Sequence, residues 1–278
     1  GFTDGATADA VGRVAQTINV EYLSVNDGTW IADTGHSVYD QIAIDAGSRL
    51  EIQQVDGSAA VVAPTVLLEG ELALDFDTDS DPGDLTGIVI TGAGSLHLIG
   101  SATLLVDDAS GLQHTGGTYV ESGTFLLTDT LGSDVYTLGA GVFQLDDGTN
   151  SGDFTGNLVN DGAFVFARSD DYTFTGDFSG TGTLEKYGEG RLTFGGLYAF
   201  DGVSTIYEGS IALTGMLADN TQLSLSGGVF DLSQVAGGTQ TIASLSGTGG
   251  TLILGDIALT INQTGTTSYA GDITGTGE

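Results

Sequence analysis

Residues 178–214 read FSGTGTLEKYGEGRLTFGGLYAFDGVSTIYEGSIALT, and this stretch decides the fold. Its large apolar residues stand singly or two positions apart, with Gly, Ser, Thr, Asp or Glu at each break; they include Leu184, Leu192, Phe194, Ile206, Ile211 and Leu213. A period of two is typical of β-strands, whereas a helix would repeat every ~3.6 residues. Such short strands cannot bury an apolar face alone. We therefore expect each strand to pair with similar strands above and below it.

Near-copies of this stretch recur along the chain. The aligned segments are 92–98 with 180–186, 114–128 with 200–214, and 268–277 with 173–182. The copies lie roughly 86–95 residues apart, which is several times the ~20–25 residues expected for one turn of a solenoid. Each copy therefore spans several turns of a stacked β-architecture.

These patterns predict a right-handed parallel β-helix of roughly twelve turns. Short strands recur about every 7–11 residues, and no window of about ten residues carries a helical stripe. An antiparallel β-sandwich is the alternative, because regular short strands alone do not fix the direction of pairing. We expect one elongated domain over residues 1–278, with the strongest repeat signal in residues 90–278.

The composition narrows the range of partners. The chain has 46 glycines, two prolines and no cysteine, so it is rich in turns and has neither disulfides nor thiolate chemistry. Five basic residues against 37 acidic ones give a formal net charge of −32. This charge opposes phosphate backbones and anionic lipid, which argues against nucleic acid and membrane surfaces as partners. No run approaches the ~18 apolar residues of a membrane-spanning helix.

Enzymes that act on polysaccharides are the competing class for this fold. Their hydrolases need converging carboxylates, one of them with a raised pKa. The adjacent acidic pairs in this chain are Asp107/Asp108, Asp146/Asp147 and Asp170/Asp171. Neighbours on a strand point to opposite faces, so we do not expect these pairs to converge, and we assign no catalytic residue.

The histidines do not indicate a metal or catalytic site. They are His36, His97 and His114, and they lack the spacing of metal ligands. His97 lies between Leu96 and Leu98 and should therefore point outward from its strand. We interpret all three histidines as solvated surface residues.

One acidic loop, residues 75–86, resembles the first half of a calcium-binding loop. The candidate ligands are Asp75, Asp77 and Asp79. Their alternate spacing suits a hard cation, which binds several carboxylate oxygens. The second half departs from the pattern, because Ser80 stands where the turn glycine belongs and Thr86 where the bidentate Glu belongs. We expect no other cofactor.

Two motifs carry a resemblance to a known family. Residues 180–196 follow the pattern G-x-G-x-L-x-K-x-G-x-G-x-L-x-F-x-G, and residues 208–213 add E-G-x-I-A-L. Together with the tail at 244–278, they resemble the passenger-associated strand repeat of bacterial autotransporters, of the self-associating adhesin-like type. The chain departs from the repeat at Tyr187, where a small polar residue is usual, and after Tyr198, where Ala-Phe-Asp replaces Thr-Gly.

This resemblance implies a right-handed β-helical stalk on the cell surface of a Gram-negative bacterium, or secreted from it. In the complete protein a membrane β-barrel would follow, and we expect the 278 residues to be a fragment that lacks it. The expected function is non-catalytic adhesion or self-association, as in aggregation and biofilm formation. The partner would be the same protein on neighbouring cells, or glycans and proteins of a host surface.

Two alternatives to this function stay open. One is a β-helical polysaccharide-active enzyme, and the other is an inert spacer that promotes export. A groove of converging carboxylates with a basic residue would favour the enzyme. Flat ladders rich in Thr, Ser and Asn would favour adhesion.

The few basic residues suggest where self-association would occur. Arg168, Lys186 and Arg191 fall within 24 residues of an otherwise acidic chain. Arg191 should face outward, because Leu192 is expected to face the core. We predict that the three basic residues form a surface patch that meets an acidic loop of a second copy.

Overall fold

The computed structural model describes most of the 278 residues. The described ranges are 13–14, 19–33, 37–53, 64–77, 85, 87–149, 151–215, 217–235 and 238–277. Within these ranges every regular element is a β-strand, and no helix is present that could cross a membrane. The chain divides into two compact units: unit 1 comprises Gly1–Tyr136 and Ala140–Val142, and unit 2 comprises Thr137–Gly139 and Phe143–Glu278. That residues 1–278 form a single elongated domain stays a prediction.

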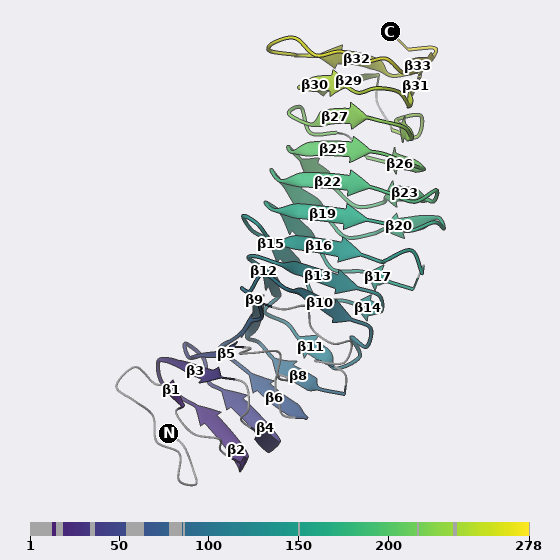
Figure 1. Cartoon of the computed structure of the whole chain (residues 1–278). Coiled ribbons are helices and arrows are strands. Elements are labelled where there is room, and N and C mark those ends of the chain that lie inside the picture. Colours follow the sequence, from purple (N-terminus) through teal and green to yellow (C-terminus); the bar gives the residue numbers. More distant parts are fainter. Residues whose placement is uncertain are drawn as a thin grey trace. The chain divides into compact units, whose positions relative to one another are not determined.

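The described part of unit 1 is built from parallel strands (Figure 1). Across its first sheet lie β1 (Arg13–Val14), β3 (Thr29–Asp33), β5 (Arg49–Gln53), β7 (Glu71–Asp75), β9 (Ser95–Leu98), β12 (Thr118–Val120) and β15 (Val135–Thr137, its last residue in unit 2). Across its second sheet lie β11 (Leu112–His114), β8 (Val89–Gly92), β6 (Thr65–Leu68), β4 (Ser37–Ile44) and β2 (Asn19–Val25). The further strands are the pair β10 (Thr103–Val106) and β13 (Thr124–Leu127), and β14 (Thr130–Leu131).

Unit 2 has the same construction in its described residues. One sheet contains β18 (Leu158–Asn160), β21 (Phe178–Gly180) and β24 (Tyr198–Phe200); a second contains β19 (Ala163–Phe166), β22 (Thr183–Lys186), β25 (Val203–Ile206), β27 (Gln222–Leu225) and β30 (Ser244–Ser246). A third contains β20 (Tyr172–Phe174), β23 (Arg191–Phe194), β26 (Ser210–Leu213), β28 (Val229–Asp231), β31 (Thr251–Gly255) and β33 (Asp272–Gly275). The remaining strands are β16 (Val142–Leu145, beginning at the unit boundary), β17 (Asp153–Phe154), and the pair β29 (Thr239–Ile242) and β32 (Ala258–Ile261).

Parallel pairing confirms the solenoid and excludes the antiparallel sandwich. Ala163 of β19 lies opposite Thr183 of β22, which in turn lies opposite Val203 of β25, and both pairings are parallel. Consecutive strands of a sheet are thus one turn apart in sequence. Over the described residues the stacked strands form a β-solenoid of about 11 turns, close to the twelve predicted.

The period of two sets which side chains enter the core. In β23, Leu192 and Phe194 are buried, whereas Arg191 and Thr193 are partly exposed, as the sequence pattern predicts. The same alternation recurs in strand after strand of both units, so each turn adds its inward side chains to one continuous stack within its unit.

Aromatic rings fill much of the stack in unit 2. Near-parallel ring pairs, with centroids 5.5, 5.5 and 4.5 Å apart, are Phe143/Phe164, Phe154/Phe174 and Phe178/Phe200. Each such contact contributes roughly 0.5–1.5 kcal/mol beyond its buried area. Because aromatic contacts run from one turn to the next, they fix the register between turns as well as filling the interior.

Two glycines of the repeat motif stand at corners where only glycine fits. Gly188 and Gly209 have φ angles of 71° and 61°, in the left-handed region. A Cβ at Gly209 would lie 2.5 Å from the carbonyl oxygens of Gly188 and Gly190. The corners of successive turns therefore stack backbone on backbone.

Leu192→Ala should lower the free energy of unfolding by about 2–5 kcal/mol, because Leu192 is fully buried and its truncation leaves a cavity. Thr193→Ala on the same strand, where the side chain points outward, should change it by less than about 1 kcal/mol. Urea unfolding followed by circular dichroism measures both values. Similar losses for the two variants would contradict the inward assignment of Leu192.

Candidate binding surfaces

A flat surface of unit 2 is formed by the outward side chains of β19, β22, β25, β27 and β30, and we call it the ladder face. The first ladder consists of Ala163, Thr183, Val203, Gln222 and Ser244. The second consists of Val165, Glu185, Thr205, Ser224 and Ser246. These side chains are small or uncharged, with Glu185 as the one exception. Figure 1 shows β19, β22, β25 and β27 lying one above another within the unit.

Repulsion between stacked charges explains why the ladders carry so few. Strands in a sheet are ~4.8 Å apart, and two carboxylates at that distance repel by about 3 kcal/mol at an effective dielectric constant of ~20. A column of acidic side chains would incur this cost at every turn. Many carboxylates of unit 2 lie in the corners instead, for example Asp161, Asp171, Asp177, Asp201 and Glu208.

Two tyrosines border the ladder face. Tyr187 follows β22 and Tyr207 follows β25, and their rings stack with centroids 4.6 Å apart. Both rings remain more than a third exposed. The hydroxyl of Tyr187 donates a hydrogen bond of 2.8 Å to Glu185, so the one charge on the ladder face is engaged within the chain.

Unit 1 instead places charges of both signs on the outward face of its first sheet. Arg49 pairs with Glu71 one turn away, and Nδ1 of His97 lies 2.7 Å from Glu121 and 3.7 Å from Glu71. The ring of His97 stacks on Tyr119 at 4.5 Å. Burial lowers the pKa of His97, although the hydrogen bond that its Nδ1 donates to the carboxylate of Glu121 acts in the opposite direction. His97 points outward as predicted, although its neighbours cover much of it.

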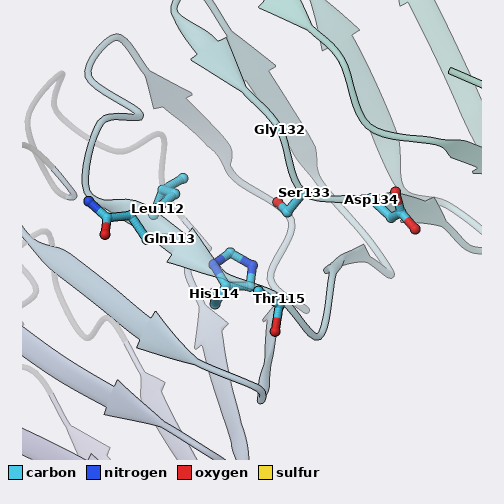
Figure 2. Close-up of a pocket in the computed structure, with 7 residues that line it drawn as sticks. All are labelled: Leu112, Gln113, His114, Thr115, Gly132, Ser133 and Asp134. Carbon is cyan, nitrogen blue, oxygen red and sulfur yellow. The ribbon is translucent and has the colours of Figure 1, made fainter. Parts of the chain in front are cut away.

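The prediction for His114 is wrong. This side chain is 2% exposed, because β11 alternates and places His114 on the inward side together with Leu112. Its Nε2 hydrogen-bonds with Oγ1 of Thr118 at 3.1 Å. The sequence signal for this burial was the position of His114 two residues after Leu112, on the same side of the strand (Figure 2). His36 lies outside the described residues.

Lys186 corrects the predicted basic surface patch. It is fully buried, because it lies two positions after Leu184 on the inward side of β22. Its Nζ donates 2.6 Å hydrogen bonds to the carbonyl oxygens of Tyr187 and Gly188 and lies 5.3 Å from the ring centroid of Phe166. The lysine thus closes the corner from inside the coil and cannot meet a second copy.

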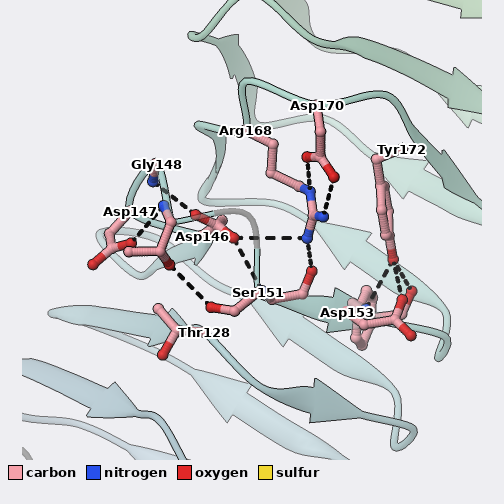
Figure 3. Close-up of polar contacts among 12 residues, drawn as sticks. Thr128, Asp146, Asp147, Gly148, Ser151, Asp153, Arg168, Asp170 and Tyr172 are labelled. Atoms are coloured by element: carbon pink, nitrogen blue, oxygen red, sulfur yellow. Dashed lines mark hydrogen bonds and ion pairs between the residues drawn. The ribbon is translucent and has the colours of Figure 1, made fainter.

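Arg168 is also buried, at 6% exposure, and it anchors the polar cluster of Figure 3. Its guanidinium donates to both carboxylate oxygens of Asp170 at 2.8 and 2.9 Å, and to the carbonyl of Gly152. Oδ2 of Asp146 lies 3.6 Å away, and the ring of Tyr172 packs against the guanidinium at 5.0 Å.

Asp146 holds the corner that this cluster stabilises. It is fully buried with a φ of 72°, an unusual conformation for a residue other than glycine. Its carboxylate accepts hydrogen bonds from the backbone N–H groups of Gly148 and Gly152, at 2.7 and 3.0 Å. Asp147 is exposed, so the adjacent pair does not converge, as expected. Asp146 and Asp170 do converge, but on a buried arginine.

Arg191 is the one member of the predicted patch that reaches the surface. Its side chain is 39% exposed, and its Nη2 donates to Asp231 at 2.9 Å across the intervening strand. With Arg168 and Lys186 buried, the three basic residues do not form a patch, and that prediction is wrong.

The calcium prediction stays a prediction. Asp75 ends β7 and Asp77 follows it, whereas Asp79 lies outside the described residues. Burial and the nearby carboxylates of Glu51 and Asp77 raise the pKa of Asp75. In the part of the chain that the structure describes, no three His, Asp or Glu side chains are grouped so as to hold a metal ion.

The stacked parallel strands and their outward ladders define this chain as a β-solenoid. Among curated proteins, it is 31% identical over 248 residues to the Adhesin BmaC autotransporter of Brucella suis biovar 1 (strain 1330). The alignment covers 82% of this chain and 7% of that relative, so the chain spans a small part of the relative's length. No protein-family model matches the chain, and no solved structure is significantly similar to it. Fold and similarity together fit an autotransporter passenger-type domain, which confirms the resemblance inferred from the motifs.

Lys186→Met should change how stability depends on pH. Burial lowers the pKa of Lys186 from 10.5 to about 8. Between these values the unfolded state binds more protons than the folded state, so the free energy of unfolding should rise with pH. We expect the wild-type chain to gain on the order of 1–2 kcal/mol relative to the variant between pH 7.5 and 9.5. Urea unfolding across this range measures the gain, and parallel curves for the two proteins would contradict it.

Proposed function

We propose that this chain is a non-catalytic, adhesive segment of an autotransporter passenger, on the surface of a Gram-negative cell or released from it. Its similarity to a protein named as an autotransporter adhesin and its β-solenoid fold support this proposal. The observation that carries it is the ladder face, a flat and nearly uncharged surface on a chain of formal net charge −32. Such ladders are the feature expected of an adhesive stalk.

The partner that best suits the ladder face is the ladder face of a second copy. Two chains of charge −32 repel each other, and this repulsion is weakest where carboxylates are farthest from the contact. Glu185, the one carboxylate among the ladder side chains, already accepts a hydrogen bond from Tyr187. Two such faces can approach without apposed columns of charge, and their Thr, Ser and Gln side chains can hydrogen-bond across the contact.

The size of the face implies weak contacts that act in numbers. Five strands spaced by ~4.8 Å give a length of about 24 Å, and two outward positions on each strand give a width of about 10 Å. This area is well below the ~800 Å² that each partner buries in a stable complex. Many copies displayed on two opposing surfaces would still hold these surfaces together, because the avidity of many linked contacts far exceeds the affinity of one.

A polysaccharide-active enzyme is the second candidate, favoured by the convergence of Asp146 and Asp170 on Arg168. The guanidinium is 6% exposed, and the Asp146 carboxylate also binds backbone N–H groups. A cluster buried in this way supports a corner of the coil and is poorly placed to meet a polymer. An inert spacer that promotes export would bind nothing.

Beads coated densely with the 278-residue chain should clump, and Thr183→Glu with Gln222→Glu should abolish the clumping. Both positions are exposed on the first ladder with Val203 between them, so the variant adds charge to each apposed face. The matched control is Ser210→Glu with Thr251→Glu, which adds the same charge to another sheet with Val229 between the two positions. The control should clump as the wild type does.

Bead turbidity and microscopy measure the clumping, and thermal unfolding verifies that both variants fold. Equal loss in the two variants would assign the effect to net charge and contradict a role of the ladder face. If wild-type beads stay dispersed but adhere to host cells, the partner is a component of the host surface and not a second copy of the chain. Beads that do neither would leave the spacer as the function.

A further inference from the structure

Tyr187 and Tyr207 form an exposed pair of stacked phenol rings on successive turns of unit 2. Their ring centroids are 4.6 Å apart, and the two ring planes differ by 7°. The side chains are 37% and 38% exposed, so small molecules in solution reach both rings. The corresponding residues of the adjacent turns are Ala167 and Ser226, so the pair is confined to two turns.

The backbone holds the two rings in register. Lys186 of β22 lies opposite Ile206 of β25, and the N–H of Tyr207 donates a 3.0 Å hydrogen bond to the carbonyl of Lys186. The N–H of Tyr187 donates the equivalent bond of 2.8 Å to the carbonyl of Phe166. Because both tyrosines continue the parallel ladder, their side chains leave the backbone side by side. Rotation of an exposed side chain is fast, so the edges of the two rings meet often.

Glu185 is placed to accept the hydroxyl proton of Tyr187. The hydroxyl donates a hydrogen bond of 2.8 Å to Oε2 of Glu185, which is within the reach required of a general base. Burial, followed by the hydrogen bond to Glu185 and its charge, raises the pKa of Tyr187, so the phenol is protonated at neutral pH. Oxidation of a phenol by one electron releases this proton. Tyr187 is therefore easier to oxidise than a tyrosine whose proton must pass directly to water.

We propose that Tyr187 and Tyr207 are a site of oxidative cross-linking, at which a peroxidase-type oxidant joins them as dityrosine. Each phenol loses one electron and its hydroxyl proton and becomes a phenoxyl radical. A C–C bond then forms between one Cε atom of each ring, and the hydrogens on these two carbons move to the phenolic oxygens. Hydrogen peroxide accepts the two electrons and two protons and is reduced to two molecules of water.

The cross-link supplies a covalent bond between turns in a chain that has no cysteine. The two tyrosines are twenty residues apart in sequence, so the bond closes one turn of the coil. Such a closure lowers the conformational entropy of the unfolded chain and therefore stabilises the fold. The bond forms within one copy and does not depend on what the ladder face contacts.

Oxidation of the dilute 278-residue chain by a haem peroxidase with hydrogen peroxide tests this proposal. Dityrosine fluorescence measures the rate, and proteolytic digestion with mass spectrometry locates the bond. We expect two peptides joined through Tyr187 and Tyr207 in the monomer fraction, with a mass two hydrogens below that of the separate peptides. The stacked pair Tyr119/Tyr136 is the internal reference and should give a lower yield, because Tyr119 is packed between the rings of His97 and Tyr136.

Three variants identify the groups responsible. Tyr207→Phe keeps the ring but removes a phenol, so it should abolish the bond and the rise in melting temperature that oxidation causes in the wild type. Glu185→Gln removes the proton acceptor at nearly constant size and should slow the reaction at least about threefold. Tyr22→Phe, at another exposed tyrosine, is the matched control and should react as the wild type does.

The proposal is overturned if the bond between Tyr187 and Tyr207 is absent or forms only between copies. It is also overturned if the yield does not exceed that of the Tyr119/Tyr136 pair, or if Glu185→Gln reacts at the wild-type rate.

Discussion

In-register parallel stacking is the constraint on which the rest of this structure depends. Each side chain lies directly above its counterpart of the previous turn, as Thr183 lies above Ala163. The nearest neighbour of a residue is therefore the residue that occupies the same position in the adjacent turn. Apolar groups benefit from this arrangement and like charges do not. The apolar side chains therefore collect inside, the carboxylates move toward the corners, and the outward ladders of unit 2 keep mostly hydroxyls, amides and small apolar groups.

Much of the fold could be predicted because the same alternation is visible in the sequence. The parallel coil, the inward Leu192 and the outward Arg191 all follow from a period of two and a long-range repeat. Lys186 and His114 were misjudged because residue type was given more weight than position, although both stand on the apolar side of their strands. A charged or polar side chain can occupy such a place where corner carbonyls or a hydroxyl satisfy it, and the pattern alone does not reveal that partner.

The Arg168 cluster could not have been found in this way. It joins Asp146 and Gly152, which lie in the corner between β16 and β17, to Asp170 in the corner between β19 and β20, and the two corners meet only because one turn stacks on the next. Asp146 adopts a left-handed backbone conformation that a sequence pattern would assign to glycine. The outward surfaces were equally hard to judge from single residues, since the ladder face is distinguished by the near absence of charged side chains over five successive turns.

The register of unit 2 also governs how such a chain can change in length. Ala163 and Thr183, Tyr172 and Leu192, and Phe178 and Tyr198 are partners that lie twenty residues apart. Loss or duplication of one such segment removes or adds one strand in each sheet. Every remaining side chain then still points inward or outward as before. Gene rearrangement can therefore lengthen or shorten the solenoid in whole turns, while a change of a single residue within a strand would turn its apolar side outward.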